Sequence, residues 1–128
     1  MNIVSQSKPV VILKFGGTSV SNLQRWKQIL TIVKLRLKQG YKVAIVHSAK
    51  SGLTNLLESF SCTKEKVLIE KINASIQALT DELNVSVNHQ SFIQQLLTYT
   101  KQEHLSNHDI ANILSFGEIM TNNCGFAY

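Results

Sequence analysis

The sequence predicts an α/β protein, because two short strand-like runs flank one amphipathic helix and further helical segments follow. Residues 9–15 and 41–46 are largely apolar and β-branched on both alternations, which is typical of strands buried on both faces of a parallel sheet. Two such strands joined through one helix run parallel, with a right-handed crossover. The loops that follow them should therefore lie side by side, at the edge where open α/β sheets bind ligands.

The segment between the two strands predicts an amphipathic helix. Ser21 and Gln24 have the spacing of a capping box, which marks a helix start. Apolar residues then recur at spacings of three and four until Gly40, a residue type that commonly ends helices. These signals define one helix with its C-terminal stop.

The second half of the chain predicts only helices. Helical periodicity starts at Thr54 and resumes after a polar turn at 84–89, and a last helix begins at Ser106, which forms an acidic capping box with Asp109. The chain then ends on a largely apolar stretch, residues 125–128. Because a two-stranded parallel sheet cannot bury its faces and edges alone, we expect the chain to be cut inside a larger fold.

The bulk composition favours one globular unit that binds a small anionic molecule. The chain has 128 residues, of which 44% are hydrophobic and 16% are charged, so it can form a core. Its net charge of +5 is spread along the chain rather than gathered in one run. Such diffuse positive charge suits a small anion better than nucleic acid.

Neither the cysteines nor the hydropathy pattern indicates a metal site, a disulfide framework or a membrane protein. Cys62 and Cys124 have no CxxC spacing and no adjacent histidine cluster. Residues 1–9 lack the features of a signal peptide, and no window approaches about 18 consecutive apolar residues. We therefore expect a cytoplasmic protein without a resident metal.

The first candidate site is the loop after the first strand. Gly16 and Gly17 let the backbone approach a bulky anion, the following helix start adds a positive dipole, and Lys14 adds a full charge. These are the components of a phosphate site, although the GK[ST] ending of a Walker A loop is absent. The alternative is a tight strand-to-helix turn with a surface lysine.

The second candidate site is residues 48–55, the loop after the second strand. Its clustered hydroxyl groups and backbone amides can hold a carboxylate or a phosphate. The alternative is that Ser51 or Thr54 is simply the N-cap of the next helix. Because both loops are expected at the same end of the sheet, their combination favours a ligand site.

The third candidate site is Glu118, in the segment 115–118 of the last helix. A carboxylate on the apolar face of that helix needs a partner. The alternative, which the segment favours when taken alone, is an exposed glutamate beside a glycine that packs.

Together, the three segments resemble one known family. KFGGTSV at 14–20, SAKSGLTNLL at 48–57 and SFGE at 115–118 are similar, in order and spacing, to the amino-terminal motifs of aspartokinases, members of the amino-acid kinase family. The resemblance implies a partial three-layer amino-acid kinase (carbamate kinase-like) fold, with a parallel sheet core and a helical subdomain. Residues 1–128 would be the amino-terminal part of the catalytic domain, without the nucleotide half and the ACT domains.

The resemblance implies that the first loop binds ATP. Lys14 would be the catalytic residue that meets the transferring γ-phosphate and stabilises its charge. Gly16 and Gly17 would offer backbone amides to the phosphates, in a phosphate-binding loop that also contains Thr18 and Ser19. Phosphoryl transfer needs mainly positioning and charge neutralisation, so ATP with Mg²⁺ would react without a covalent intermediate.

The resemblance also implies an aspartate pocket formed by Ser48, Thr54 and Glu118, in which Glu118 pairs with the substrate's α-amino group. The whole enzyme would convert ATP and L-aspartate into ADP and 4-phospho-L-aspartate, the first step towards lysine, threonine and methionine. The family's later Gly-Gly-Ser-Asp motif is not in this sequence. We therefore expect no kinase turnover by this chain alone.

Two residues depart from the family pattern. The family often has a branched apolar residue where His47 stands, and a small or apolar residue where Lys50 stands. We expect His47 to be a packed or half-exposed residue rather than a base, because a carboxylate nucleophile has no proton to remove. The Lys50 cation would either help to bind an acidic substrate or point to solvent.

Other functions remain open. The chain could be a non-catalytic binding module derived from the kinase fold, or part of another amino-acid kinase with a different acidic substrate. Its parent could be a single kinase, or a fusion with homoserine dehydrogenase or diaminopimelate decarboxylase. We also expect a homo-oligomer, because the sheet edge and the apolar carboxyl end would be exposed.

Overall fold

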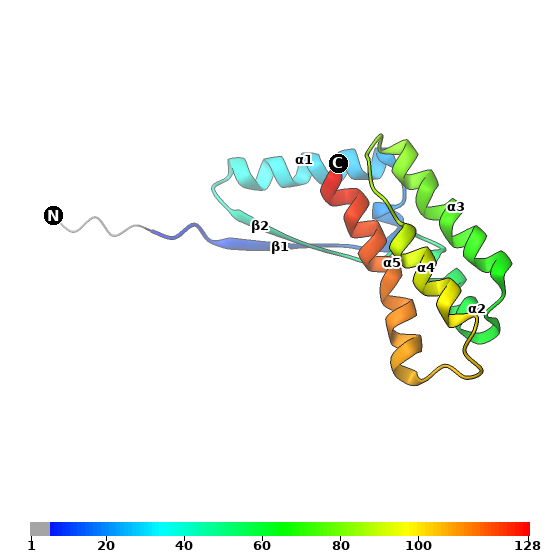
Figure 1. Cartoon of the computed structure of the whole chain (residues 1–128). Helices are drawn as coiled ribbons and strands as arrows, with labels where there is room; N and C mark the ends of the chain where they lie inside the picture. The colour runs from blue at the N-terminus through cyan, green and yellow to red at the C-terminus, as the bar shows by residue number, and fades with distance from the viewer. Residues whose placement is uncertain (1–5) are drawn as a thin grey trace.

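The computed structural model describes residues 6–128 and contains a small parallel sheet joined to a larger group of helices (Figure 1). This architecture confirms the predicted α/β class, with a parallel sheet and a helical subdomain. In chain order the elements are β1 (Val10–Phe15), the 3-10 helix η1 (Gly17–Val20), α1 (Leu23–Lys38), β2 (Lys42–His47), α2 (Leu53–Thr63), α3 (Lys66–Glu82), α4 (Gln90–Tyr99) and α5 (Asn107–Ala127).

The strands β1 and β2 pair in parallel, as predicted, with α1 as the connection between them. The register ends with the pair of Phe15 and His47, the last residues of the two strands. The sheet ladder continues one step further, because the Ser48 N–H donates to the Phe15 carbonyl at 3.1 Å. The two loops that follow the strands therefore start next to each other.

The prediction that both strands are buried on both faces is wrong for the described residues. Alternate residues of β1 are exposed, and the exposed fractions of Val10 and Ile12 are 63% and 68%. The helix α1 packs against the other face of the sheet (Figure 1). An apolar run shows what a strand is able to bury, but within residues 6–128 only one face of this sheet has a helix layer on it.

The helix starts agree with the prediction only in part. The N-cap of α1 is Asn22, whose side chain accepts a hydrogen bond from a backbone N–H of the first turn at 3.0 Å. The predicted capping box of Ser21 and Gln24 is therefore wrong, because Ser21 ends the short helix η1 instead. The capping box of Ser106 and Asp109 at the start of α5 is confirmed.

The helices α2 to α5 form a subdomain (Figure 1), and their apolar core is continuous with Val20 of η1 and with Trp26 and Ile29 of α1. The core confirms the predicted helical periodicity, and residues 84–89 form a turn between two helices as expected. Fully buried large side chains of this core include Leu57, Phe60, Ile72, Ile76, Leu79, Leu96, Ile113 and Met120. Across residues 6–128, none of the helices has the length and apolar character that a membrane crossing needs.

Candidate functional site

The loop after β1 packs directly against the loop after β2. A Cβ atom on Gly17 would lie 2.6 Å from the backbone oxygen of Ala49, so no side chain fits there unless the loops move apart. Ser21 links the same two loops, since its hydroxyl donates to the Gly17 carbonyl at 2.5 Å and accepts from the Ser51 N–H at 3.0 Å. The predicted side-by-side arrangement of the loops is confirmed.

The helix α5 brings the third motif onto the loop after β2. A Cβ atom on Gly117 would lie 3.0 Å from Ala49 Cβ and 3.8 Å from Thr54 Oγ1. One turn later, the Thr121 hydroxyl donates to the Gly117 carbonyl at 2.7 Å and accepts from the Lys50 N–H at 3.0 Å. Ala49 is thus enclosed between two glycines, and the three motifs converge on it.

The start of α2 excludes one interpretation of the second loop. The N-cap is Gly52, which has a left-handed backbone at φ 84° and makes no side-chain cap hydrogen bond. The alternative that Ser51 or Thr54 is the N-cap is therefore wrong, because a left-handed glycine turn starts this helix. Thr54 is half-buried in the first turn of α2 beside Gly117, and Ser48 is exposed at the start of the loop.

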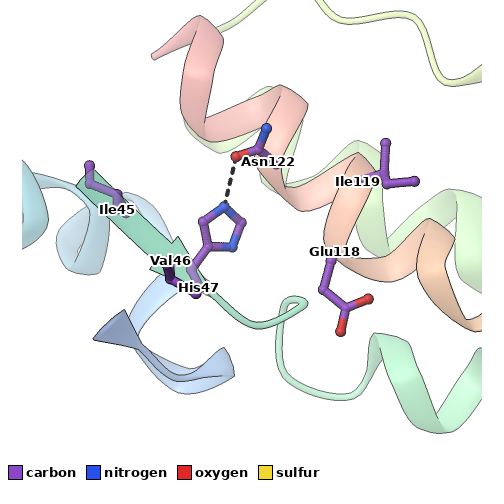
Figure 2. Close-up of a pocket in the computed structure, with 6 residues that line it drawn as sticks. All are labelled: Ile45, Val46, His47, Glu118, Ile119 and Asn122. Atoms are coloured by element: carbon purple, nitrogen blue, oxygen red, sulfur yellow. Dashed lines mark hydrogen bonds between the residues drawn. The ribbon is translucent and has the colours of Figure 1, made fainter. Parts of the chain in front are cut away.

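A cavity of about 330 Å³ lies between the end of β2 and α5 (Figure 2). Glu118 and Asn122, one helical turn apart on α5, line this cavity together with His47. Both nitrogens of the His47 ring have partners: Nε2 lies 3.0 Å from Asn122 Oδ1, and Nδ1 lies 2.9 Å from the Ser48 carbonyl oxygen. The ring is half-buried, which confirms the expectation of a packed residue. The other lining residues are Ile45, Val46 and Ile119.

Glu118 is exposed and Gly117 beside it is buried. This confirms the interpretation of an exposed glutamate next to a packing glycine. No ion pair involves the Glu118 carboxylate within residues 6–128. Because the same side chain lines the cavity, its charge is available to a cationic group of a ligand.

The predicted phosphate-loop residues lie at the end of β1 and in η1. Lys14 is exposed and pairs in the sheet register with Val46, which lines the cavity described above. Thr18 is exposed, and Ser19 is half-buried with its N–H donating to the Gly16 carbonyl at 3.0 Å. In the described part of the chain, neither the Gly17 N–H nor the Thr18 N–H donates a hydrogen bond to another backbone group. These two donors remain available to an anion.

Lys50 does not point to solvent, so that alternative is wrong. The side chain is half-buried, and its ammonium donates to the Ser75 carbonyl of α3 at 2.7 Å. Burial lowers the pKa of Lys50 below its ordinary value, while the charges of Glu82 and Cys124 act in the opposite direction. The cation is therefore committed to a contact inside the protein.

Three residues that the sequence did not single out as site residues hold the site together. Ser21 joins the two loops, Thr121 joins α5 to the second loop, and Asn122 holds the His47 ring. Thr121 and Asn122 lie four residues after Gly117 and Glu118, so they occupy the same helix face. That spacing is the one sequence signal that points to them.

Comparison with known proteins agrees with these motifs. Residues 9–123 match the amino acid kinase family. An aspartokinase of Rickettsia bellii is 32% identical over 90% of this chain, and an aspartokinase of Chlamydia trachomatis is 30% identical over 91% of it. The chain spans only 31% and 27% of the length of these two relatives.

Solved structures share the fold. Aspartokinase III of E. coli in complex with lysine and aspartate matches 94% of this chain with a TM-score of 0.73 at 22% identity. Its complex with aspartate and ADP matches the same share with a TM-score of 0.70 at 21% identity, and the chain covers 28% of either structure. The structural likeness establishes the fold, and the family match covers all three motifs. The chain therefore belongs to the amino acid kinase family, and it is related to aspartokinases.

Proposed function

We propose that this chain is the amino-terminal part of an aspartate kinase catalytic domain, and that the whole protein transfers the γ-phosphoryl group of ATP to the side-chain carboxylate of L-aspartate. The convergence of three motifs on Ala49 carries the proposal, because it gathers a glycine loop, a hydroxyl-rich loop and an unpaired carboxylate at one end of a parallel sheet. The named aspartokinase relatives and the aspartokinase III complex with aspartate and ADP support it. The product, 4-phospho-L-aspartate, would start lysine, threonine and methionine synthesis.

The first loop would bind the phosphates of ATP. The unpartnered N–H groups of Gly17 and Thr18 can donate hydrogen bonds to an anion, Gly16 leaves open space beside them, and Lys14 adds a positive charge. Fixed donors of this kind stabilise the charge of a transferring phosphoryl group. The described part of the chain has no group of three or more His, Cys, Asp or Glu residues able to hold a metal ion. Mg²⁺ would accompany ATP as part of the substrate, because proteins usually bind this ion through substrate phosphates and one or two carboxylates.

The second loop and α5 would bind aspartate. Glu118 would accept the α-ammonium group, and the hydroxyl groups of Ser48 and Thr54 would donate to the carboxylates. A carboxylate nucleophile is already deprotonated, so the reaction needs no general base. The His47 ring, which has a partner at each nitrogen, fits a supporting role in the pocket wall.

Calorimetric titration of the 128-residue chain with L-aspartate and with succinate tests the pocket. Succinate lacks the ammonium group, so the wild-type chain should prefer aspartate, and Glu118→Gln should remove the preference. A hydrogen bond between charged groups predicts a loss of about tenfold to a hundredfold in aspartate affinity. Glu103→Gln is the matched control, because Glu103 is 91% exposed and does not line the cavity. Unchanged aspartate preference in Glu118→Gln would contradict the assignment.

Turnover should require the rest of the protein. The chain spans less than a third of its curated relatives, and the Gly-Gly-Ser-Asp motif of the family is absent from it. We therefore expect no 4-phospho-L-aspartate when the purified chain is incubated with L-aspartate, ATP and Mg²⁺. Formation of that product would contradict this expectation. Binding of neither aspartate nor ATP would mean that this part of the protein is only scaffold, and the activity would then have to be tested in the whole protein.

A further inference from the structure

Lys50 connects segments that are far apart in the sequence. Its ammonium donates to the Ser75 carbonyl of α3 at 2.7 Å, and its backbone N–H donates to Thr121 Oγ1 of α5 at 3.0 Å. Its carbonyl accepts from the Leu53 N–H at 3.1 Å, at the start of α2. We infer that Lys50 is a positioning residue, which holds the loop after β2 against α3 and α5 at the same time.

The surroundings of the ammonium are unfavourable for an ordinary surface lysine. The side chain is half-buried, its acceptor is an uncharged carbonyl, and no ion pair involves it within residues 6–128. An ammonium that leaves water without a carboxylate partner loses solvation, and the lowered pKa of Lys50 reflects this burial. An apolar side chain of similar length would be easier to bury. The contact with Ser75 is therefore what a lysine contributes at this position.

The loop around Lys50 has little freedom to adjust. Ala49 is buried between Gly17 and Gly117, so a shift of the Lys50 backbone changes both of those contacts. Ser48 directly precedes Ala49. Lys50 therefore acts on Ser48 through the backbone, without itself contacting a ligand. Only this last step, from loop position to aspartate binding, depends on the proposed function.

Amide hydrogen exchange across residues 48–53 tests the inference in the 128-residue chain. Lys50→Met keeps the aliphatic stem and removes the ammonium, whereas Lys50→Arg keeps a cationic donor. Lys71→Met is the matched control, because Lys71 is exposed on α3 and makes no side-chain hydrogen bond in the described structure. We expect Lys50→Met to speed exchange in the loop by about tenfold or more relative to Lys71→Met, because a charged hydrogen bond is lost. Lys50→Arg should restore slow exchange.

The pattern of exchange separates positioning from general stability. Faster exchange confined to residues 48–53, with rescue by arginine, supports the inference. Unchanged loop exchange, or equal acceleration in the buried core of α3, would overturn it. Lys50→Gln serves as a second charge-free variant, and failure of both neutral variants to fold would also overturn the inference, because the residue would then support the whole subdomain.

A parallel titration with L-aspartate distinguishes this inference from the proposed function. If the wild-type chain binds aspartate, Lys50→Met should bind it about tenfold more weakly while Lys71→Met binds as the wild type does. If the wild-type chain does not bind aspartate, the aspartate pocket is wrong for this chain, and the exchange result still decides the role of Lys50.

Discussion

One added methyl group at Gly17 should separate the loop after β1 from the loop after β2, whereas the same change at Gly16 should not. The new Cβ at position 17 would lie 2.6 Å from Ala49 O and 3.5 Å from Ser51 N, two backbone atoms that no rotamer change can move. Nothing lies within 4 Å of a Cβ at position 16, where φ is −77°. Both substitutions replace a glycine with alanine, but only the one at position 17 creates a steric clash. Comparing them therefore separates the effect of the clash from the effect of losing a glycine.

The two substitutions should change the free energy of unfolding in opposite directions. Overpacking destabilises a protein by about 1–3 kcal/mol, and one hydrogen bond lost through Ser21 adds about 0.5–1.5 kcal/mol. Gly17→Ala should therefore lower the free energy of unfolding by about 2–4 kcal/mol. Gly16→Ala has no clash and restricts the unfolded chain, so it should raise that free energy by about 0.4–1 kcal/mol.

Urea unfolding followed by far-ultraviolet circular dichroism measures both changes. With a dependence on urea of about 1–3 kcal/mol per M, Gly17→Ala should lower the midpoint by about 1 M or more, and Gly16→Ala should raise it slightly. Amide chemical shifts of Ala49 and Ser51 should change only in Gly17→Ala. Equal midpoints for the two variants would refute the argument that the loops are in close backbone contact.

Three further experiments test the packing of the core and the titration of a buried histidine. Gly125→Ala should destabilise the chain by about 1–3 kcal/mol or more and shift its tryptophan fluorescence, because the Cβ would lie 2.0 Å from the ring of Trp26; an unchanged spectrum would contradict this packing. Phe60→Ala should cost about 3–5 kcal/mol and Phe126→Ala under about 0.5 kcal/mol, since the exposed fractions are 0% and 92%; similar urea midpoints would be inconsistent with that burial. Burial lowers the pKa of His89 below its ordinary value. As the pH falls, the unfolded chain therefore takes up a proton at this histidine before the folded chain does, at about pH 6.5. The free energy of unfolding should therefore fall as the pH is lowered from 7.5 to 5, and His89→Gln should reduce that fall; an identical pH dependence in the variant would argue against a buried neutral imidazole.

The position of the site could be predicted from the sequence because it depends on topology. Two apolar runs with one helix between them permit only a parallel pair, and the ends of parallel strands meet at one edge. The contact between Gly17 and Ala49 is a direct consequence of that edge. What the sequence pattern could not reveal is which side chains join the loops. Ser21 resembled a helix N-cap, because Ser is a preferred N-cap residue and Gln24 follows it three residues later. In the structure Ser21 ends a short 3-10 helix instead, and its hydroxyl joins the two loops.

The role of Lys50 could not be predicted for a different reason. A lysine in a polar loop normally extends into water, because its desolvation is unfavourable. Its acceptor here is the Ser75 carbonyl, which is 25 residues away in the sequence and has no side-chain signature. The open face of β1 is a similar case, since the apolar pattern of Val10 and Ile12 does not indicate whether another layer covers them.

The two motif glycines that meet Ala49 connect the packing of the site to its proposed chemistry. A phosphoryl group is transferred between atoms that start only about 3–3.5 Å apart, so a loop that binds the donor must touch a loop that binds the acceptor. Side chains at Gly17 or Gly117 would hold the three segments apart, as the short contacts to Ala49 demonstrate. The small residues therefore bring the backbones together, and they leave the groups that would bind ligand, the Lys14 ammonium and the Glu118 carboxylate, exposed. Close packing among glycines and alanine, and the proposed binding of ATP and aspartate, would thus be two consequences of the same arrangement.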